Sequence, residues 1–534
     1  MTDVQVPESH ASEPLEERKL HLGWALVLIS MAQLMVVLDA SIANIALPFI
    51  GDDLNIAQAN LTWIVTGYAL AFGGLLLLGG RLGDLYGRRR IFMTGLIIFA
   101  VASFIGGLAQ NEAMLLASRG LQGLGAALAS PAALALITTT FPAGPARNRA
   151  FAVYAAMSGA GAAVGLILGG WLTGLDPILG LEGWRWTFLI NVPIGLIAAF
   201  LAPRFLNESE SHPGWLDVPG AITGTLGLLG LVYGFSRAGE EAHGWGDTWT
   251  IASLAAGVVL LAVFGFIESR VKHPLLPVRV FANRTRATSF LVMALVPAAM
   301  FAMFYFLSLF IQLVVGYSPL RTGFAFLPFS VGIVIGAGLS SNLVNRVNPR
   351  YIAGIGTLMA AAALVGFSLL DVPTSTEALM AVTADNPLGG DVNYWASIFP
   401  YIMLMSVGMG MVFVPLTLTA VHHLRAEDSG IGSGVLNTMQ QVGGALGLAI
   451  LGTVSLHYAE GTKTDLFGEL VANGLTPEQA GRAAFVGSFT EGATAAFLVG
   501  AVLIALGSAA IWAFLNVKHE ELATDGPEGG VHVG

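Results

Sequence analysis

The stretch "GGRLGDLYGRRR", residues 79–90, joins two apolar runs at 60–79 and 91–110 and places four arginines in one short loop. Each run is about 20 residues long, which is the length that a helix needs to cross roughly 30 Å of hydrocarbon. Arginines concentrate in loops that stay on the cytoplasmic side of a membrane. The stretch therefore predicts a membrane-spanning helical hairpin with its loop inside.

The composition of the whole chain agrees with this interpretation. Of its 534 residues, 55% are hydrophobic and only 11% are charged, and the mean hydropathy is +0.74. These values exclude a soluble globular chain and indicate an integral membrane protein. The absence of cysteine excludes disulfides and thiolate metal sites, and no basic stripe is present to bind nucleic acid.

Fourteen apolar segments of spanning length recur along the chain, and the first is expected to be a retained helix because the residues before it are too acidic and polar for a signal peptide. The alternative is twelve spans, with 217–236 and 249–268 re-entrant. The predicted spans are 23–49, 60–79, 91–110, 113–141, 150–174, 185–205, 217–236, 249–268, 287–313, 321–345, 350–370, 395–420, 430–457 and 491–515.

The loop charges predict the orientation. With the N-terminus inside, most Lys and Arg fall on the cytoplasmic side, whereas the outer loop 371–394 carries four acidic residues and no basic ones. We therefore expect a multi-pass protein of the cell inner (plasma) membrane with both termini cytoplasmic. In the outer segment 459–490, "TPEQ" at 476–479 predicts a capping box and a short amphipathic helix.

Two pairs of segments indicate an internal repeat. Residues 79–92 align with 340–352, and residues 123–134 align with 408–418. Two homologous halves are typical of transporters that work by alternating access. In this alignment Leu404 falls opposite Arg119, and neither Arg119 nor Asp39 has a charged counterpart, so the ionisable groups are expected to act in the first half.

The loop matches the pattern G-x-L-x-D-x-x-G-R-R/K and resembles the signature of the major facilitator superfamily. Three further stretches resemble its fourteen-helix drug:proton antiporter branch: "LDASIANIALP" at 38–48, "RGLQGLGAALASPAAL" at 119–134 and "WRWTFLINVPIG" at 184–195. The fifth predicted helix departs from the branch, because "VGLILGG" has Leu166 where a proline is usual.

The resemblance implies an all-α fold of two six-helix bundles with two extra helices between them. The corresponding domains are a cytoplasmic N-terminal tail at 1–22, a bundle at 23–205, a two-helix linker at 206–286, a second bundle at 287–515 and a cytoplasmic tail at 516–534.

Asp39 lies about 16 residues into its helix, or roughly 24 Å at about 1.5 Å per residue, somewhat beyond the midplane. An ionised carboxylate there would cost several kcal/mol, so a proton-coupling role is expected. The resemblance implies that Arg119 lies close to Asp39 and modulates it. The alternatives are that Asp39 only tightens helix packing through Ser41 or Asn44, and that Arg119 snorkels or bonds carbonyls at the cytoplasmic side.

The loop itself is interpreted as a conformational latch, a role that the resemblance implies. The alternative is a purely topogenic loop, which would explain the arginines but not the spacing of the other residues. The latch residues are Gly80, Asp84, Gly87, Arg88 and Arg89.

Glycines repeat every four residues in the fifth predicted helix and provide a smooth strip for close helix approach. The strip is either a sliding surface or static packing. This helix-packing motif comprises Gly161, Gly165, Gly169 and Gly170.

Aromatic residues and amides in four predicted helices would suit a cavity for bulky amphipathic or cationic compounds. The alternative is that many of them face lipid or core. The predicted cavity residues are Asn44, Gln122, Phe301, Phe304, Tyr305, Asn437, Gln440 and Gln441. We expect Glu491 to be an interfacial cap at the outer start of the last helix, and the adjacent His422 and His423 to be solvated at the interface, because neighbours on a helix do not face one metal.

Together these features predict a proton-coupled exporter of amphipathic or cationic small molecules, such as drugs or antibiotics, that works as a monomer in the lipid bilayer without a cofactor or metal. The alternative is an exporter dedicated to one metabolite or lipid. No catalytic residues are expected, since the sequence offers no paired buried catalytic groups and no Walker loop. A receptor would need a signalling domain, which the sequence does not contain.

Overall fold

The structure is a computed structural model. It describes residues 15–142, 145–208, 216–240, 243–272, 274–344, 346–371, 392–422, 429–472 and 474–524. Helices account for nearly all of these residues. They are α1 (Leu15–Leu54), α2 (Gln58–Tyr86), α3 (Arg88–Gly107), α4 (Glu112–Thr140), α5 (Pro145–Thr173), α6 (Gly183–Leu189), α7 (Asn191–Phe205), α8 (Val218–Ala238), α9 (Thr248–Arg270), α10 (Arg284–Leu309), α11 (Pro319–Ala325), α12 (Leu327–Leu343), α13 (Pro349–Ser368), α15 (Phe399–Val421), α16 (Ser429–Ala472), α17 (Pro477–Phe514) and α18 (His519–Thr524).

Thirteen spans in the described part of the chain are long and apolar enough to cross a membrane. They agree with thirteen of the predicted segments, and two of them combine neighbouring helices, α6 with α7 and α11 with α12. The remaining predicted segment is α5, in which the described apolar stretch is the shorter Gly161–Thr173. The predicted outer loop 371–394 lies mostly outside the described residues.

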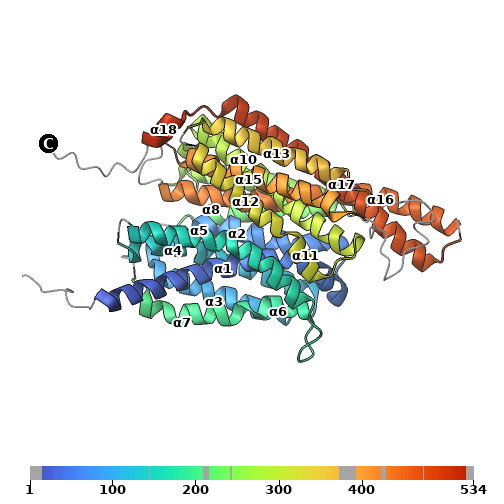
Figure 1. Cartoon of the computed structure of the whole chain (residues 1–534), viewed down its shortest axis with the longest axis horizontal. Coiled ribbons are helices and arrows are strands. Elements are labelled where there is room, and N and C mark those ends of the chain that lie inside the picture. Colours follow the sequence, from blue (N-terminus) through green and yellow to red (C-terminus); the bar gives the residue numbers. More distant parts are fainter. Residues whose placement is uncertain are drawn as a thin grey trace, which may run out of the picture.

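The outer segment after residue 459 differs from its prediction. Thr476 caps α17, and its capping box with Gln479 is confirmed. However, the segment does not form a separate short helix, because α16 continues to Ala472 and α17 begins at Pro477. The two spanning helices themselves continue beyond the other helices as a hairpin (Figure 1), and the turn between them contains Gly474, whose φ is +96°.

The described helices form two bundles (Figure 1). Helices α1–α7 make the first bundle and α10–α17 the second, while α8 contacts both α2 and α16. At these contacts Gly74 of α2 lies against Thr225, and the Thr453 hydroxyl of α16 donates to the carbonyl oxygen of Phe235. Helix α9 packs on α8 and leaves large apolar side chains such as Trp249 exposed, which is the surface expected of a lipid-facing helix.

The internal repeat is visible in helix packing, but its register differs from the sequence alignment. Gly95 of α3 and Gly125 of α4 approach each other closely, and Gly356 of α13 and Gly408 of α15 do the same. Gly408 therefore corresponds to Gly125 and not to Gly123. The G-x-G spacing occurs in both segments, so a shift of two residues was invisible in the sequence. The corrected register places Ile402, not Leu404, opposite Arg119; both are apolar.

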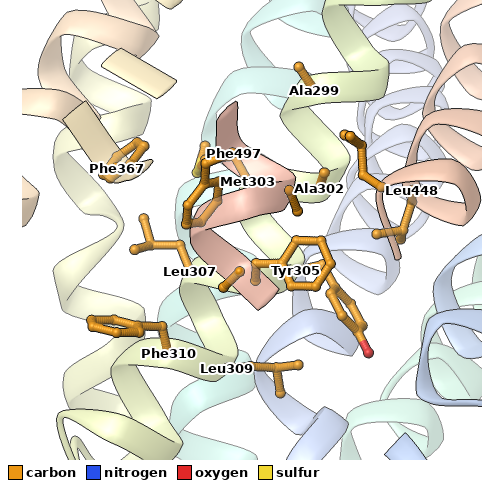
Figure 2. Packing of buried hydrophobic residues seen from close by; sticks show 14 of the residues in the cluster. Ala299, Ala302, Met303, Tyr305, Leu307, Leu309, Phe310, Phe367, Leu448 and Phe497 are labelled. Carbon is orange, nitrogen blue, oxygen red and sulfur yellow. The ribbon is translucent and has the colours of Figure 1, made fainter. Parts of the chain in front are cut away.

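The second bundle packs around α10, which is apolar on all sides as expected of a buried helix. Figure 2 shows Met303 and Leu307 of this helix, and Phe310 directly after it, in one apolar cluster with Phe367 and Phe497. The rings of Phe367 and Phe497 have centroids 5.5 Å apart. This part of the second bundle is therefore a packed apolar core, whereas Asp39 and Arg119, both buried, lie in the first bundle.

Candidate functional site

The carboxylate of Asp39 lies in the middle of the apolar span Leu22–Leu54, and its residue is only 2% exposed. Its Oδ2 accepts a hydrogen bond from Nη1 of Arg119 at 2.6 Å. Its Oδ1 accepts from the amide nitrogens of Gln122 at 2.9 Å and Asn191 at 3.1 Å. Three donors, one of them cationic, therefore surround a carboxylate that has no access to solvent.

The guanidinium of Arg119 is 1% exposed and makes contacts beyond the ion pair. Its Nη1 also donates to Oε1 of Gln122 at 2.8 Å, and its Nε donates to the backbone carbonyl of Ile64 at 2.7 Å. Its Cζ lies 4.5 Å from the centre of the Tyr68 ring, within cation–π range. Arg119 thus bonds a backbone carbonyl of α2 as well as Asp39, but it is buried and does not snorkel.

Local sequence positions these groups. Asn111 caps the start of α4 by accepting from the backbone nitrogen of Met114 at 2.9 Å, and it thereby sets the helix that carries Arg119 and Gln122. Asn191 is the first residue of α7, which follows α6 after Ile190, and its amide donates to Asp39 of α1.

Gln122 and Asn191 both donate to Oδ1 of Asp39, while Arg119 donates to Oδ2. Nε2 of Gln122 also donates to Oγ of Ser103 at 2.8 Å, so its whole amide is used inside the network. The structure therefore places Gln122 with the ion pair and not in a substrate cavity as predicted. Asn191 was missed, although it lies in "WRWTFLINVPIG"; its signal was an amide in an otherwise apolar part of that stretch.

This arrangement can hold a charge and release it. The Asp39 carboxyl group is paired with a cation and accepts hydrogen bonds at both oxygens, which are the contacts that a buried charge requires. Any movement of α4 relative to α1 would break the ion pair, and a proton would then be the means of neutralising Asp39. Such a movement would also release the Ile64 carbonyl of α2.

The predicted latch residues all contact their own bundle. Asp84 pairs with Arg88 at 3.2 Å within the same loop. Arg89 donates to the carbonyl of Leu206 at 3.0 Å and lies 3.6 Å from the carboxylate of Glu208. A Cβ on Gly87, whose φ is +101°, would collide with that carboxylate. A contact of these residues across the bundle interface is not present in the described part of the chain.

Gly80 of the same loop lies beside Pro131 of α4, with 3.7 Å between the Pro131 Cβ and a Cβ built on the glycine. The role of this loop as a conformational latch stays a prediction.

The glycine strip of α5 brings that helix against α1. Cβ atoms built on Gly165 and Gly169 would each lie 2.9 Å from a side-chain atom of Ser41 and Ile42, respectively. Gly161 faces α1 in the same way, through Leu34 and Val37. Gly170 faces the other bundle instead, where a Cβ would lie 2.5 Å from the Pro319 carbonyl oxygen of α11.

A cavity of about 450 Å³ is lined by residues of α2, α8, α10, α16 and α17. We assign this end of the helices to the outer side of the membrane. Its wall combines rings such as Tyr305 and Phe489 with polar groups such as Gln58, Thr62 and Lys463. Thr62 is two residues from Ile64, whose carbonyl binds Arg119. The cavity and the ion-pair network are therefore connected through the first turns of α2.

Of the eight predicted cavity residues, Tyr305 lines this cavity. Phe301 packs on Gly444, and Phe304 stacks on Phe326 with 5.2 Å between ring centroids. Asn437 is exposed. The structure therefore does not gather these side chains around this cavity.

Apart from Gln122, which lies with the ion pair, three predicted cavity residues remain, and all three are partly buried. The side-chain amide of Asn44 donates to the backbone carbonyl of Ala40 at 3.2 Å. The backbone carbonyl of Asn44 accepts from the hydroxyl of Ser308 in the second bundle at 3.2 Å. Gln441 lies against Gly73 at the α2–α16 contact. Gln440 precedes it on the same helix.

Two interfacial predictions were wrong. Glu491 lies inside α17, not at its start, and accepts a hydrogen bond from Thr462 of α16. His422 is buried, and its backbone carbonyl accepts from Nη1 of Arg286 at 3.0 Å. His423 lies outside the described residues. No group of three or more metal-ligating side chains occurs within the described ranges.

The fold and the buried ion pair define a multi-pass helical membrane protein of the transporter class. The family model of the Major Facilitator Superfamily matches residues 29–448. The chain belongs to this family.

Relatives extend the likeness over most of the chain. It is 43% identical to a puromycin resistance protein of Streptomyces alboniger over 81% of each chain. It is 38% identical to a cephamycin export protein of Amycolatopsis lactamdurans, over 83% of this chain and 87% of the relative. Among solved structures, a bacterial homologue of the human lysosomal transporter Spinster, inward-facing and unoccupied, matches with a TM-score of 0.65 and 18% identity over 95% of this chain and 98% of that one. That likeness shows the fold.

Proposed function

We propose that this protein exports antibiotics or other amphipathic small molecules in exchange for protons, and that Asp39 is the proton-coupling group. The buried pair of Asp39 and Arg119 carries the proposal, because an intramembrane ion pair without solvent access is costly and is a mark of function. The relatives support the substrate class, since they include a puromycin resistance protein, a cephamycin export protein and a tetracenomycin C resistance and export protein.

Coupling follows from the two states of the pair. With Arg119 at 2.6 Å, Asp39 stays ionised. Separation of the two side chains would leave a bare buried carboxylate, which takes up a proton instead. Because Arg119 also holds the Ile64 carbonyl, the same step alters α2 beside the cavity. Substrate in the cavity and a proton on Asp39 would therefore favour different conformations.

The contacts between the bundles support an inward-facing state. Gly170 of α5 touches Pro319 of α11 at the ends that we assign to the outer side. Asp84 pairs inside its own loop, as expected of a disengaged latch. We propose that the loop of residues 80–89 engages the second bundle when the protein opens outward.

The topology completes the proposal. Helix α5 is 29 residues long, which exceeds the roughly 20 needed to span the hydrocarbon, so we count it as the fourteenth span. We further propose that α8 and α9 form the linker of 206–286, that both termini are cytoplasmic, and that the monomer is the working unit.

The decisive measurement is puromycin-coupled proton flux in proteoliposomes containing the full chain. Wild type is expected to move protons across the membrane when puromycin is added on one side, and Asp39→Asn is expected to bind puromycin without moving protons. Asp53→Asn is the matched control, because Asp53 lies on the same helix and pairs with Arg185 at 2.8 Å outside the network.

Unchanged drug-coupled flux in Asp39→Asn would remove that residue from the mechanism. If wild type moved puromycin and other transported antibiotics without protons, antiport itself would be wrong. Transport of only one compound in a panel would favour the dedicated exporter.

A further inference from the structure

Two carboxyl side chains meet where α8 begins and α9 ends, far from Asp39 along the fold. Asp217 is the N-cap residue of α8 and is 4% exposed, while Glu268 lies in the last turn of α9 and is 5% exposed. Both side chains are thus withdrawn from solvent at the end of the hairpin that we assign to the cytoplasmic side.

Each carboxyl group uses one of its oxygens in a backbone hydrogen bond. Oδ1 of Asp217 accepts from the nitrogen of Gly220 at 2.8 Å, and Oε2 of Glu268 accepts from the nitrogen of Leu276 at 2.8 Å. These bonds fix both side chains in place. They also point the second oxygen of each group toward the other.

The second oxygens, Oδ2 of Asp217 and Oε1 of Glu268, are buried and have no hydrogen-bond donor within the described ranges. They converge at Gly220: a Cβ built there would lie 2.9 Å from Oε1 of Glu268 and in contact with Oδ2 of Asp217. The two carboxyl groups are within hydrogen-bonding reach of each other. Glycine at 220 is what leaves room for this approach.

No cation compensates this pair in the described part of the chain. Asp217 is the charged neighbour that acts on Glu268. Arg270 lies over the Phe266 ring, with Cζ 5.3 Å from its centre, and Asp84 is paired with Arg88. Helix α16 contributes no ionisable side chain between 429 and 456. The other ionisable groups at this end of the packed elements are Arg81 on α2 and Lys272 and Arg279 after α9.

Two facing carboxylates without a donor would repel each other and leave both oxygens unsatisfied. One proton removes both penalties, because the O–H of one carboxyl then donates to the carboxylate of the other. We propose that Asp217 and Glu268 share one proton at neutral pH and form a second protonation site, separate from Asp39.

The location gives this site a consequence for the conformational cycle. Helix α8 is bound to the first bundle through Thr225 and Gly74 and to the second through Phe235 and Thr453. The shared proton joins the ends of α8 and α9. Loss of that proton would separate these ends, so the hairpin is expected to loosen as the cytoplasmic pH rises.

The test counts protons on the purified full chain and requires no transport. Unfolding by SDS in weakly buffered detergent at pH 7 is expected to release one more proton from wild type than from Glu268→Gln, because the amide supplies its own donor and binds no proton. Across about pH 5 to pH 8, the melting temperature of wild type should fall relative to that of Glu268→Gln.

Asp247→Asn is the matched control at the opposite end of the same hairpin. Asp247 pairs with Arg237 at 2.7 Å, and this hydrogen bond lowers the pKa of Asp247 to about 2. This residue is therefore ionised throughout that pH range, so its variant should release as many protons as wild type and keep the same pH profile.

Infrared spectroscopy provides a measurement that does not depend on the folding of one variant. Wild type at pH 7 should show a protonated-carboxyl band that is lost in both Glu268→Gln and Asp217→Asn. Equal proton release from wild type and Glu268→Gln, or absence of the band in wild type, would overturn the proposal. A melting temperature that responds to Ca²⁺ and not to pH would show that a bound cation, and not a proton, lies between the two carboxyl groups.

Discussion

The strength of the Asp39–Arg119 pair can be measured by a double-mutant cycle with Asp39→Asn and Arg119→Met. Asp39→Asn leaves a guanidinium that is 1% exposed without a counter-charge, and such a loss costs about 3–5 kcal/mol of unfolding free energy. Arg119→Met leaves the carboxylate with two amide donors, from Gln122 and Asn191. The double variant keeps those amide contacts and contains no uncompensated charge.

The double variant is therefore expected to lose less stability than the two single variants together, with a coupling free energy of about 2–3 kcal/mol. Equilibrium unfolding in mixed SDS micelles, followed by helical circular dichroism, measures all four proteins. Asp53 and Arg185 provide the control cycle, because their 2.8 Å separation is close to the 2.6 Å of the buried pair but they lie at a more exposed position. Their coupling should stay below about 1 kcal/mol.

The pH dependence of Arg119→Met gives a second signature. Without its cation, Asp39 is neutralised by a proton in the folded state, so this variant should lose stability as the pH rises. Equal coupling in the buried and control cycles would refute the claim that the pair is a desolvated ion pair. A flat pH profile in Arg119→Met would show that Asp39 does not take up a proton when its partner is removed.

Three further predictions concern the surroundings of the site. Gly170→Val should force the ends of α5 and α11 apart, because its Cβ would lie 2.5 Å from the Pro319 carbonyl oxygen. The chain has no native cysteine, so spin labels can be attached to single cysteines introduced at these two ends, and they should report a longer distance in the variant. Asn191→Leu removes the 3.1 Å donor to Asp39 and should weaken puromycin-coupled proton flux in proteoliposomes while preserving expression, whereas Asn191→Gln should restore part of it. Since the hydrogen bond from Arg237 lowers the pKa of Asp247 to about 2, the stabilisation lost in Asp247→Asn should be full at neutral pH and disappear as the pH is lowered from about 4 toward 2 in thermal unfolding.

The sequence correctly predicted the features that the lipid environment determines, namely the membrane-spanning helices. A backbone in hydrocarbon must satisfy its own hydrogen bonds, so apolar runs of sufficient length become helices whatever their detailed packing. The same logic singled out Asp39 and Arg119, because a charge within such a run requires compensation. The structure adds the distance between them, which sequence spacing did not contain.

Sequence reasoning failed where the answer depends on how separate helices meet. Asn191 is 152 residues from Asp39 in the sequence and reaches it only through the packing of α7 beside α1. Gln122 was assigned to the cavity because an amide suits both a substrate cavity and a buried ion-pair network. Only the neighbouring side chains in the structure show which of the two it occupies. The outward extension of α16 and α17 was missed because a polar segment can continue a helix once it leaves the membrane.

Helix α2 explains how the ion pair can influence the rest of the molecule. Its Ile64 carbonyl is held by Arg119, and Thr62, two residues earlier, lines the cavity. Further along, Gly73 packs against Gln441 of the second bundle. A helix transmits displacement along its axis because its hydrogen bonds make it rigid. A displacement of α2 after release of the Ile64 carbonyl is therefore expected to reach both contacts. On the proposed mechanism, proton uptake by Asp39 therefore acts on substrate and on the bundle interface through the same helix, without a separate relay.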